Sequence, residues 1–187
     1  DGTLWCWGGN TAGQLGSRQC EDHPEPLQVG TASNWDRVGV GGGLSCAIDI
    51  HGALTCWGGL DYGQADCSTT QSLPPTLIPG TWVDVSAHYY AVHALAVDGS
   101  LWRIGDTTSS SNPSGGLGRL EPIEAGDTWR SMATGLGATQ VCGVLASGRL
   151  VCVPSDGTSP TGTSAIDWEG PIGVRDHVCA TRTDGSL

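Results

Sequence analysis

One pattern recurs along the chain and limits what the chain can fold into. Its most complete copy is residues 45–58, Ser-Cys-Ala-Ile-Asp-Ile-His-Gly-Ala-Leu-Thr-Cys-Trp-Gly, in which two short apolar runs flank a glycine turn. This pattern predicts a β-hairpin. If Gly52 ends a three-residue loop in the left-handed conformation, Cys46 lies opposite Cys56. Opposed residues of antiparallel strands have Cα atoms about 4.5–5.5 Å apart, so a Cys46–Cys56 disulfide across the hairpin is predicted.

The same template fits four other glycines when cysteines are sought six residues before and four residues after the glycine. At Gly148 it finds Cys142 and Cys152, which predicts a second disulfide. At Gly99 it finds His93 and Arg103, so this copy has lost the bridge, and a tolerated cross-strand pair is favoured over a ligand site.

The two ends of the chain carry complementary halves of the template. Cys179 lies six residues before Gly185, and Cys6 lies four residues after Gly2. Three interpretations of Cys6 and Cys179 remain open. The two cysteines pair and close a ring of four within one chain, or they pair between chains and join the tail of one subunit to the head of the next. In the third interpretation, each cysteine pairs with a neighbouring repeat of a longer propeller.

Cys20 and Cys67 complete the eight cysteines. They follow Gly16 and Gly63 by four residues each, which are nearly equivalent positions in neighbouring repeats. A bridge between these two loops is therefore predicted.

Four repeat units follow from the spacing of an anchor, Leu-x-Cys-Trp-Gly, at residues 4–8 and 54–58, with weaker copies at 101–105 and 150–154. We expect units at residues 1–50, 51–98, 99–147 and 148–187, the last completed by the strand at residues 4–8. Tryptophans at repeat-equivalent positions are predicted to pack in the core between units: Trp7, Trp57, Trp35, Trp82, Trp129 and Trp168.

Each unit offers about four short strands separated by turn signals, and no segment has helical periodicity. Several strands are apolar on both faces and need cover on both sides. Four-stranded units of this length, stacked face to face around an axis, describe an all-β fold, a β-propeller of four repeat units.

Composition limits the function classes. The chain has 19 acidic side chains against 8 basic ones, and its net charge of -11 argues against binding nucleic acid. An even number of cysteines without CxxC pairs predicts disulfides, and therefore a secreted or cell-surface location. No apolar run approaches the roughly 20 residues of a membrane span. Without a signal peptide or initiator methionine, we expect a mature or processed segment.

The order of these signals resembles a known family. The chain contains, in this order, Cys-Trp-Gly, Gly-Gln-Leu-Gly, a proline, Trp-x-x-Val and Cys-Ala-(x)4-Gly. This series is similar to the regulator of chromosome condensation repeat, in the cysteine-bearing form of bacterial secreted and surface proteins. The resemblance implies a propeller that works as a binding platform, usually with seven blades. The founding member acts on a small GTPase and touches chromatin, and another relative is a secreted inhibitor of β-lactamases.

No catalytic motif and no alternating calcium-ligand spacing is present, so we expect no enzyme activity, cofactor or metal. The predicted function is a non-catalytic extracellular interaction or structural module that binds a protein partner or copies of itself, head to tail through the split hairpin. The alternative is a secreted propeller-type inhibitor of an enzyme such as a β-lactamase. His88, Tyr89 and Tyr90 form a candidate partner patch, although an ordinary strand is favoured. The hydroxyl-rich residues 107–114 and 158–164 are candidate positions for O-linked glycan, although plain solvated loops are favoured.

Overall fold

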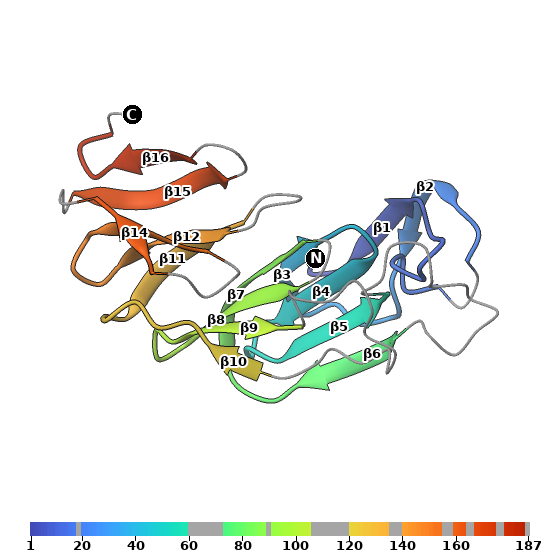
Figure 1. Cartoon of the computed structure of the whole chain (residues 1–187). Helices are drawn as coiled ribbons and strands as arrows, with labels where there is room; N and C mark the ends of the chain where they lie inside the picture. The colour runs from blue at the N-terminus through green and yellow to red at the C-terminus, as the bar shows by residue number, and fades with distance from the viewer. Residues whose placement is uncertain are drawn as a thin grey trace.

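The computed structural model describes residues 1–17, 20–59, 73–88, 91–105, 120–134, 140–154, 159–163, 167–174 and 178–185. Throughout these ranges every regular element is a β-strand, and all strand pairs are antiparallel (Figure 1). The all-β fold predicted from the repeats is confirmed.

Three sheets have four strands each and are called blades. The first blade contains β3 (Trp35–Val40), β4 (Leu44–Asp49), β5 (Leu54–Gly58) and β6 (Leu73–Ile78). The second contains β7 (Trp82–Ala87), β8 (Val92–Ala96), β9 (Leu101–Ile104) and β10 (Leu120–Pro122). The third contains β11 (Trp129–Ala133), β12 (Gln140–Leu145), β13 (Leu150–Pro154) and β14 (Thr161–Gly162).

Two further sheets have two strands each and are called half-blades. The N-terminal half-blade pairs β1 (Trp5–Gly8) with β2 (His23–Gln28), and the C-terminal half-blade pairs β15 (Trp168–Val174) with β16 (Val178–Arg182). Consecutive sheets contact each other through their inner strands: β7 lies against β3 and β4, and β15 lies against β11 and β12. The sheets follow one another along an arc, with the half-blades at its two ends (Figure 1).

The hairpin of the first blade has the register predicted from the sequence. Gly52 has φ +81°, and its amide donates to the Asp49 carbonyl oxygen at 2.9 Å, so Cys46 stands opposite Cys56. The Asp49 carboxylate accepts hydrogen bonds from the amides of His51 and Ala53, both at 2.9 Å. The template glycines at the other hairpins and at both chain ends also have positive φ: Gly2, Gly99, Gly148 and Gly185.

A backbone hydrogen bond links each hairpin turn to the following sheet. The Trp82 amide, at the start of the second blade, donates to the Gly52 carbonyl oxygen at 2.9 Å. The equivalent bonds join Trp35 to Gly2, Trp129 to Gly99 and Trp168 to Gly148. The tryptophan therefore makes the same backbone contact with the preceding turn in all four repeats, although 33, 30, 30 and 20 residues separate the two positions.

The tryptophans differ in burial. Trp57, Trp82 and Trp129 are buried, and Trp35 and Trp168 are half-buried. Trp7 does not lie in the core as predicted, because 60% of its surface is exposed. Trp57, its repeat equivalent, lies in a complete blade, whereas Trp7 lies in a sheet that lacks two of the four strands.

Candidate protein-interaction surface

The complete blades show what the template forms when all four strands are present. In the first blade the Sγ atoms of Cys46 and Cys56 are 2.15 Å apart, and in the third those of Cys142 and Cys152 are 2.06 Å apart. Each pair joins the second strand of its blade to the third. Cys46 and Cys56 are fully buried and lie in the same hydrophobic cluster as Val85 and Ala94 of the second blade.

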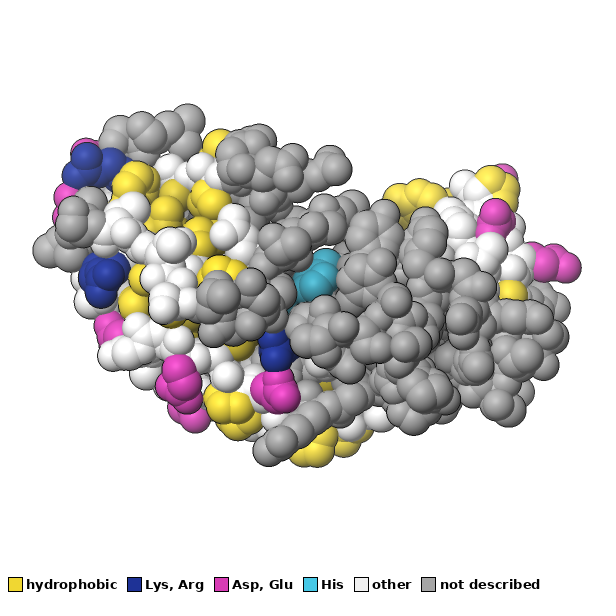
Figure 2. Space-filling view, viewed as in Figure 1, with side chains coloured by type: hydrophobic (Ala, Val, Ile, Leu, Met, Phe, Trp, Pro, Cys, Tyr) yellow, Lys and Arg dark blue, Asp and Glu magenta, His cyan; other side chains and the backbone are white. Residues whose placement is uncertain are grey.

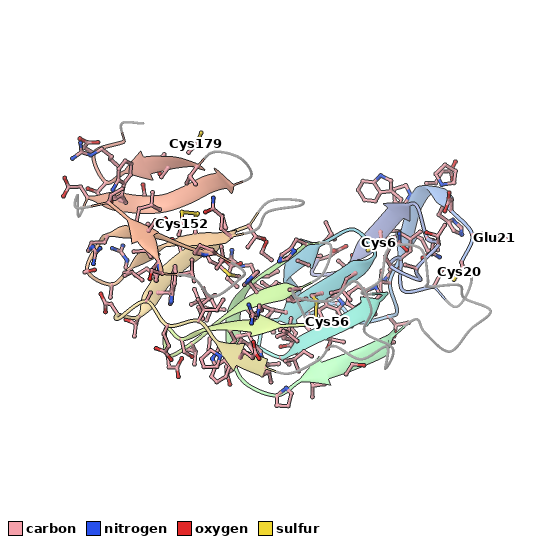
Figure 3. All side chains as sticks on the ribbon, viewed as in Figure 1. Cys6, Cys20, Glu21, Cys56, Cys152 and Cys179 are labelled. Carbon is pink, nitrogen blue, oxygen red and sulfur yellow. A yellow bond between two sulfur atoms is a disulfide. The ribbon has the colours of Figure 1, made fainter. Side chains whose placement is uncertain are left out.

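The half-blades contain the same positions on separate sheets. By its place in the template β1 is a third strand, with Cys6 where β5 has Cys56, and β16 is a second strand, with Cys179 where β4 has Cys46. Cys6 and Cys179 are free thiols, and they lie near opposite ends of the arc (Figure 3). Cys6 is half-buried, and this burial raises the pKa of its thiol. Cys179 is exposed.

In each half-blade, the strand that bears the template cysteine has one edge without a ladder partner among the described residues. β1 pairs with β2, and β16 pairs with β15, whereas the second and third strands of a complete blade each have two neighbours. Unpaired backbone N–H and C=O groups along a strand edge are a template for adding another strand.

An apolar groove of about 390 Å³ adjoins the free edge of β1. Its walls include exposed hydrophobic side chains from β1 and β3: Trp5, Trp7, Val38 and Val40, which are 48%, 60%, 52% and 61% exposed. Among the described residues, none that lines the groove is charged. Hydrophobic side chains gather at this tip of the molecule (Figure 2).

The alternation of side chains between the two faces of β3 explains why Val38 and Val40 are exposed. A Cβ atom on Gly39 would lie 2.8 Å from the Val85 carbonyl oxygen, so this residue faces the second blade at close approach. Val38 and Val40 therefore point to the opposite face, toward the N-terminal half-blade. In the second blade, the equivalent strand β7 is covered by β3 and β4, the first and second strands of the preceding sheet. These are the two strands that the N-terminal half-blade lacks.

The remaining predicted site residues lie elsewhere. His88 is only 4% exposed and stacks on His93 with ring centroids 5.2 Å apart, so it does not offer a docking surface. Tyr89 and Tyr90 lie outside the described residues. Cys20 is disulfide-bonded, and its predicted partner, Cys67, lies outside the described residues.

Two further observations, on metal binding and on a membrane span, concern the part of the chain that the structure describes. No group of three or more His, Cys, Asp or Glu side chains is placed to hold a metal ion there. The described ranges also contain no helix long and apolar enough to span a bilayer.

Comparison with known proteins agrees with this architecture. Residues 1–48 match the family model of the regulator of chromosome condensation (RCC1) repeat. A search of curated protein sequences found no significant match.

Solved structures of RCC1-type propellers superpose on nearly the whole chain. Human WBSCR16 matches with a TM-score of 0.68 and 16% identity over 89% of this chain and 49% of its own. Yeast RCC1 (Prp20), in a complex with Kap60, matches with a TM-score of 0.67 and 15% identity over 98% of this chain and 51% of its own. Saccharomyces cerevisiae Prp20p, described with its binding to Gsp1p and histones, matches with a TM-score of 0.57 and 18% identity. The match covers 81% of this chain and 41% of Prp20p.

The chain thus spans about half the length of these structures. It carries an RCC1 repeat at residues 1–48 and has the fold of the RCC1-type β-propellers along nearly all of its length.

Proposed function

We propose that this chain is a non-catalytic, extracellular protein-interaction module that binds through its incomplete blades, with a second copy of itself as the partner. The observation that carries the proposal is the pair of free strand edges on β1 and β16. They bear Cys6 and Cys179, the two positions that form the cystine in the first and third blades.

A second copy fits the N-terminal groove because its C-terminal half-blade supplies the missing strands. If β16 of one copy pairs with β1 of another as β4 pairs with β5, Cys179 stands opposite Cys6. The sheet then has the order β15-β16-β1-β2, which matches a complete blade. β15 and β16 would cover Val38 and Val40 as β3 and β4 cover β7.

The direction of this contact makes the assembly head to tail. The half-blades lie at opposite ends of the arc, so each copy offers one half to each neighbour (Figure 1). Such a heterologous contact gives a closed ring or a filament, depending on whether the rotation closes.

The extracellular part of the proposal rests on the cystines. Disulfides persist in oxidising compartments, and the structure holds two inter-strand pairs, Cys46–Cys56 and Cys142–Cys152. An enzyme inhibitor, the alternative from the sequence, would place the same groove against a different protein. The hydroxyl-rich stretches 107–114 and 158–164 remain predicted positions for O-linked glycan and lie largely outside the described residues.

The test uses two single-cysteine variants of the full chain. Cys6→Ser retains only the tail cysteine of the pair, and Cys179→Ser retains only the head cysteine. We expect the wild type to form multimers that are joined by Cys6–Cys179 disulfides and lose this link on reduction. Mixing the two variants should give a cross-linked heterodimer, while neither variant alone forms this link.

Non-reducing mass spectrometry with peptide mapping identifies the bond, and sedimentation velocity gives the size of the particle. A monomer at every concentration, or a Cys6–Cys179 bond within one chain, would contradict self-assembly. A monomer that inhibits an added enzyme would favour the inhibitor.

A further inference from the structure

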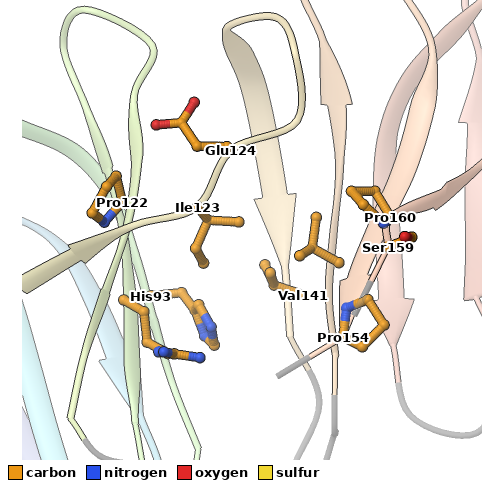
Figure 4. Close-up of a pocket in the computed structure, with 10 residues that line it drawn as sticks. His93, Pro122, Ile123, Glu124, Val141, Pro154, Ser159 and Pro160 are labelled. Carbon is orange, nitrogen blue, oxygen red and sulfur yellow. The ribbon is translucent and has the colours of Figure 1, made fainter. Parts of the chain in front are cut away.

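A second pocket lies between the second and third blades. Its volume is about 400 Å³ (Figure 4). His93 faces it from the second blade, and Val141 and Pro154 face it from the third. Ile123 and Pro122 come from the connection between the two blades.

The pocket stands where the repeat has lost its cystine. His93 on β8 pairs with Arg103 on β9, in the register that joins Cys46 to Cys56 in the first blade. Between the first and second blades the compact cystine packs without exposed surface. Between the second and third blades the two larger polar side chains line the cavity instead.

His93 is a buried polar group with unused hydrogen-bonding capacity. The side chain is 1% exposed, and its Nδ1 atom has no hydrogen-bond partner among the residues that the structure describes. Burial lowers its pKa to about 3, with smaller contributions from His88 and Arg103, so the imidazole is neutral at physiological pH. A buried polar atom without a partner is costly, so a ligand that supplies one gains the corresponding free energy.

Charge is distributed unevenly around the pocket. Arg103 is mostly buried and donates from Nη2 to the Glu121 carboxylate, while Glu124 is exposed. The inner wall therefore carries an imidazole and a guanidinium that is paired with the Glu121 carboxylate, and the Glu124 carboxylate lies at the exposed side. Ile123, Val141 and Val153 provide apolar surface between them.

We propose that this pocket binds a small organic carboxylate with an apolar body. The carboxylate lies beside His93 and Arg103, and the body packs against Ile123, Val141 and Val153. Cavities of a few hundred Å³ with apolar walls and a few convergent polar groups are typical small-molecule sites.

Isothermal titration of the full chain with three related probes tests the chemistry. Phenylacetate has the proposed carboxylate, phenylacetamide replaces it with a neutral amide, and phenethylamine carries a positive charge. We expect saturable binding of phenylacetate, about tenfold tighter than the amide or the amine, because charge-assisted hydrogen bonds exceed neutral ones by about this factor. Equal or tighter binding of the amide or the amine, or no saturable binding of any probe, would overturn the proposal.

Variants locate the site. The double variant His93→Cys/Arg103→Cys installs the residues that the template has at these positions, so we expect it to fold and to lose phenylacetate binding. Near-ultraviolet circular dichroism checks the fold. His51→Gln, which alters an exposed histidine in the turn of the first blade, is the matched control and should bind normally. Normal binding by the folded double variant would overturn the assignment.

Glu124→Gln gives an independent readout that a damaged fold does not mimic. Removing the carboxylate at the exposed side should tighten phenylacetate binding about two- to threefold and leave the amide unaffected. Unchanged or weaker phenylacetate binding in this variant would contradict the placement of the carboxylate in the pocket.

Discussion

Two positions in each repeat decide how neighbouring sheets meet. They hold cysteines in the first and third blades and His93 and Arg103 in the second. The cystine is small and apolar and fits a closed interface. The polar pair keeps a hydrogen-bonding group and a charge inside the molecule, which is physically unfavourable unless something compensates.

Acid should destabilise the fold through His93. Its pKa is about 3 in the native state because of burial, whereas an unfolded histidine titrates near 6.5. The unfolded chain therefore binds a proton below pH 6.5 that the native chain does not, and the free energy of unfolding falls as pH decreases from 6.5 toward 3. The limiting slope is about 1.4 kcal/mol per pH unit.

Urea unfolding at a series of pH values between about 6.5 and 4.5 measures this slope while most carboxylates stay ionised. His93→Gln should flatten it. Burial also lowers the pKa of His88, so some slope should remain in that variant. The exposed-turn variant His51→Gln should keep the wild-type slope, and an unchanged slope in His93→Gln would contradict the prediction.

At the scale of the element, the repeated hairpin is the unit of stability. Its turn glycine has positive φ and also contacts the next blade: a Cβ on Gly52 would lie 2.8 Å from Thr81 Cγ2 and 3.0 Å from the Trp82 carbonyl oxygen. The turn therefore fixes both the register within one blade and the approach of the following blade.

Gly52→Ala should lower the free energy of unfolding by about 2–3 kcal/mol, because backbone strain and a steric clash act together. Gly30→Ala is the matched control. Gly30 also has positive φ, but a Cβ there would have no atom within 4 Å, so we expect a loss of about 1 kcal/mol. Chemical denaturation compares the two, and equal losses would show that the inter-blade contact contributes nothing.

Removing the first-blade cystine should also destabilise the fold. Cys46→Ala/Cys56→Ala releases a constraint that spans 10 residues, which corresponds to about 2–3 kcal/mol. The double variant is compared with its parent in a Cys6→Ser/Cys179→Ser background, so that the proposed link between copies does not affect the transition. Thermal unfolding under non-reducing conditions should show a large decrease in Tm for the double variant only; similar Tm values would mean that the cystine adds no stability.

The hairpins were predictable from the sequence because their determinants are local. The glycine turn and the spacing on either side of it specify the pairing of Cys46 with Cys56 and of His93 with Arg103. Burial of individual side chains was less predictable, because it depends on neighbouring sheets. Trp7 occupies a core position of the repeat but lacks its cover, and His88, which the sequence offered as a candidate for partner binding, is enclosed.

At the scale of the whole molecule, the arrangement of the blades was not accessible from the repeats. Repeat spacing reveals how many strands there are, but the rotation between consecutive sheets comes from side-chain packing at each interface. The structure places the half-blades at opposite ends of an arc, so the thiols of Cys6 and Cys179 lie far from each other (Figure 3).

The net charge should oppose association between copies of this chain at low ionic strength. Each copy carries a formal charge of -11, whereas the groove beside β1 has no charged lining. Like-charged copies repel each other over the Debye length, about 10 Å at 0.1 M salt and shorter at higher concentrations. Adding salt should therefore screen the repulsion and leave the apolar contact intact.

We expect Cys6→Ser/Cys179→Ser, which removes the covalent link, to associate more strongly in about 0.5 M NaCl than in dilute buffer. Sedimentation velocity over a range of protein concentrations measures this change. Val38→Lys in the same background places a charge in the groove and should abolish association at both salt concentrations, because a lysine buried there would lack an acidic partner. Association that weakens with added salt would instead indicate an interface held by ion pairs, which the uncharged groove does not provide.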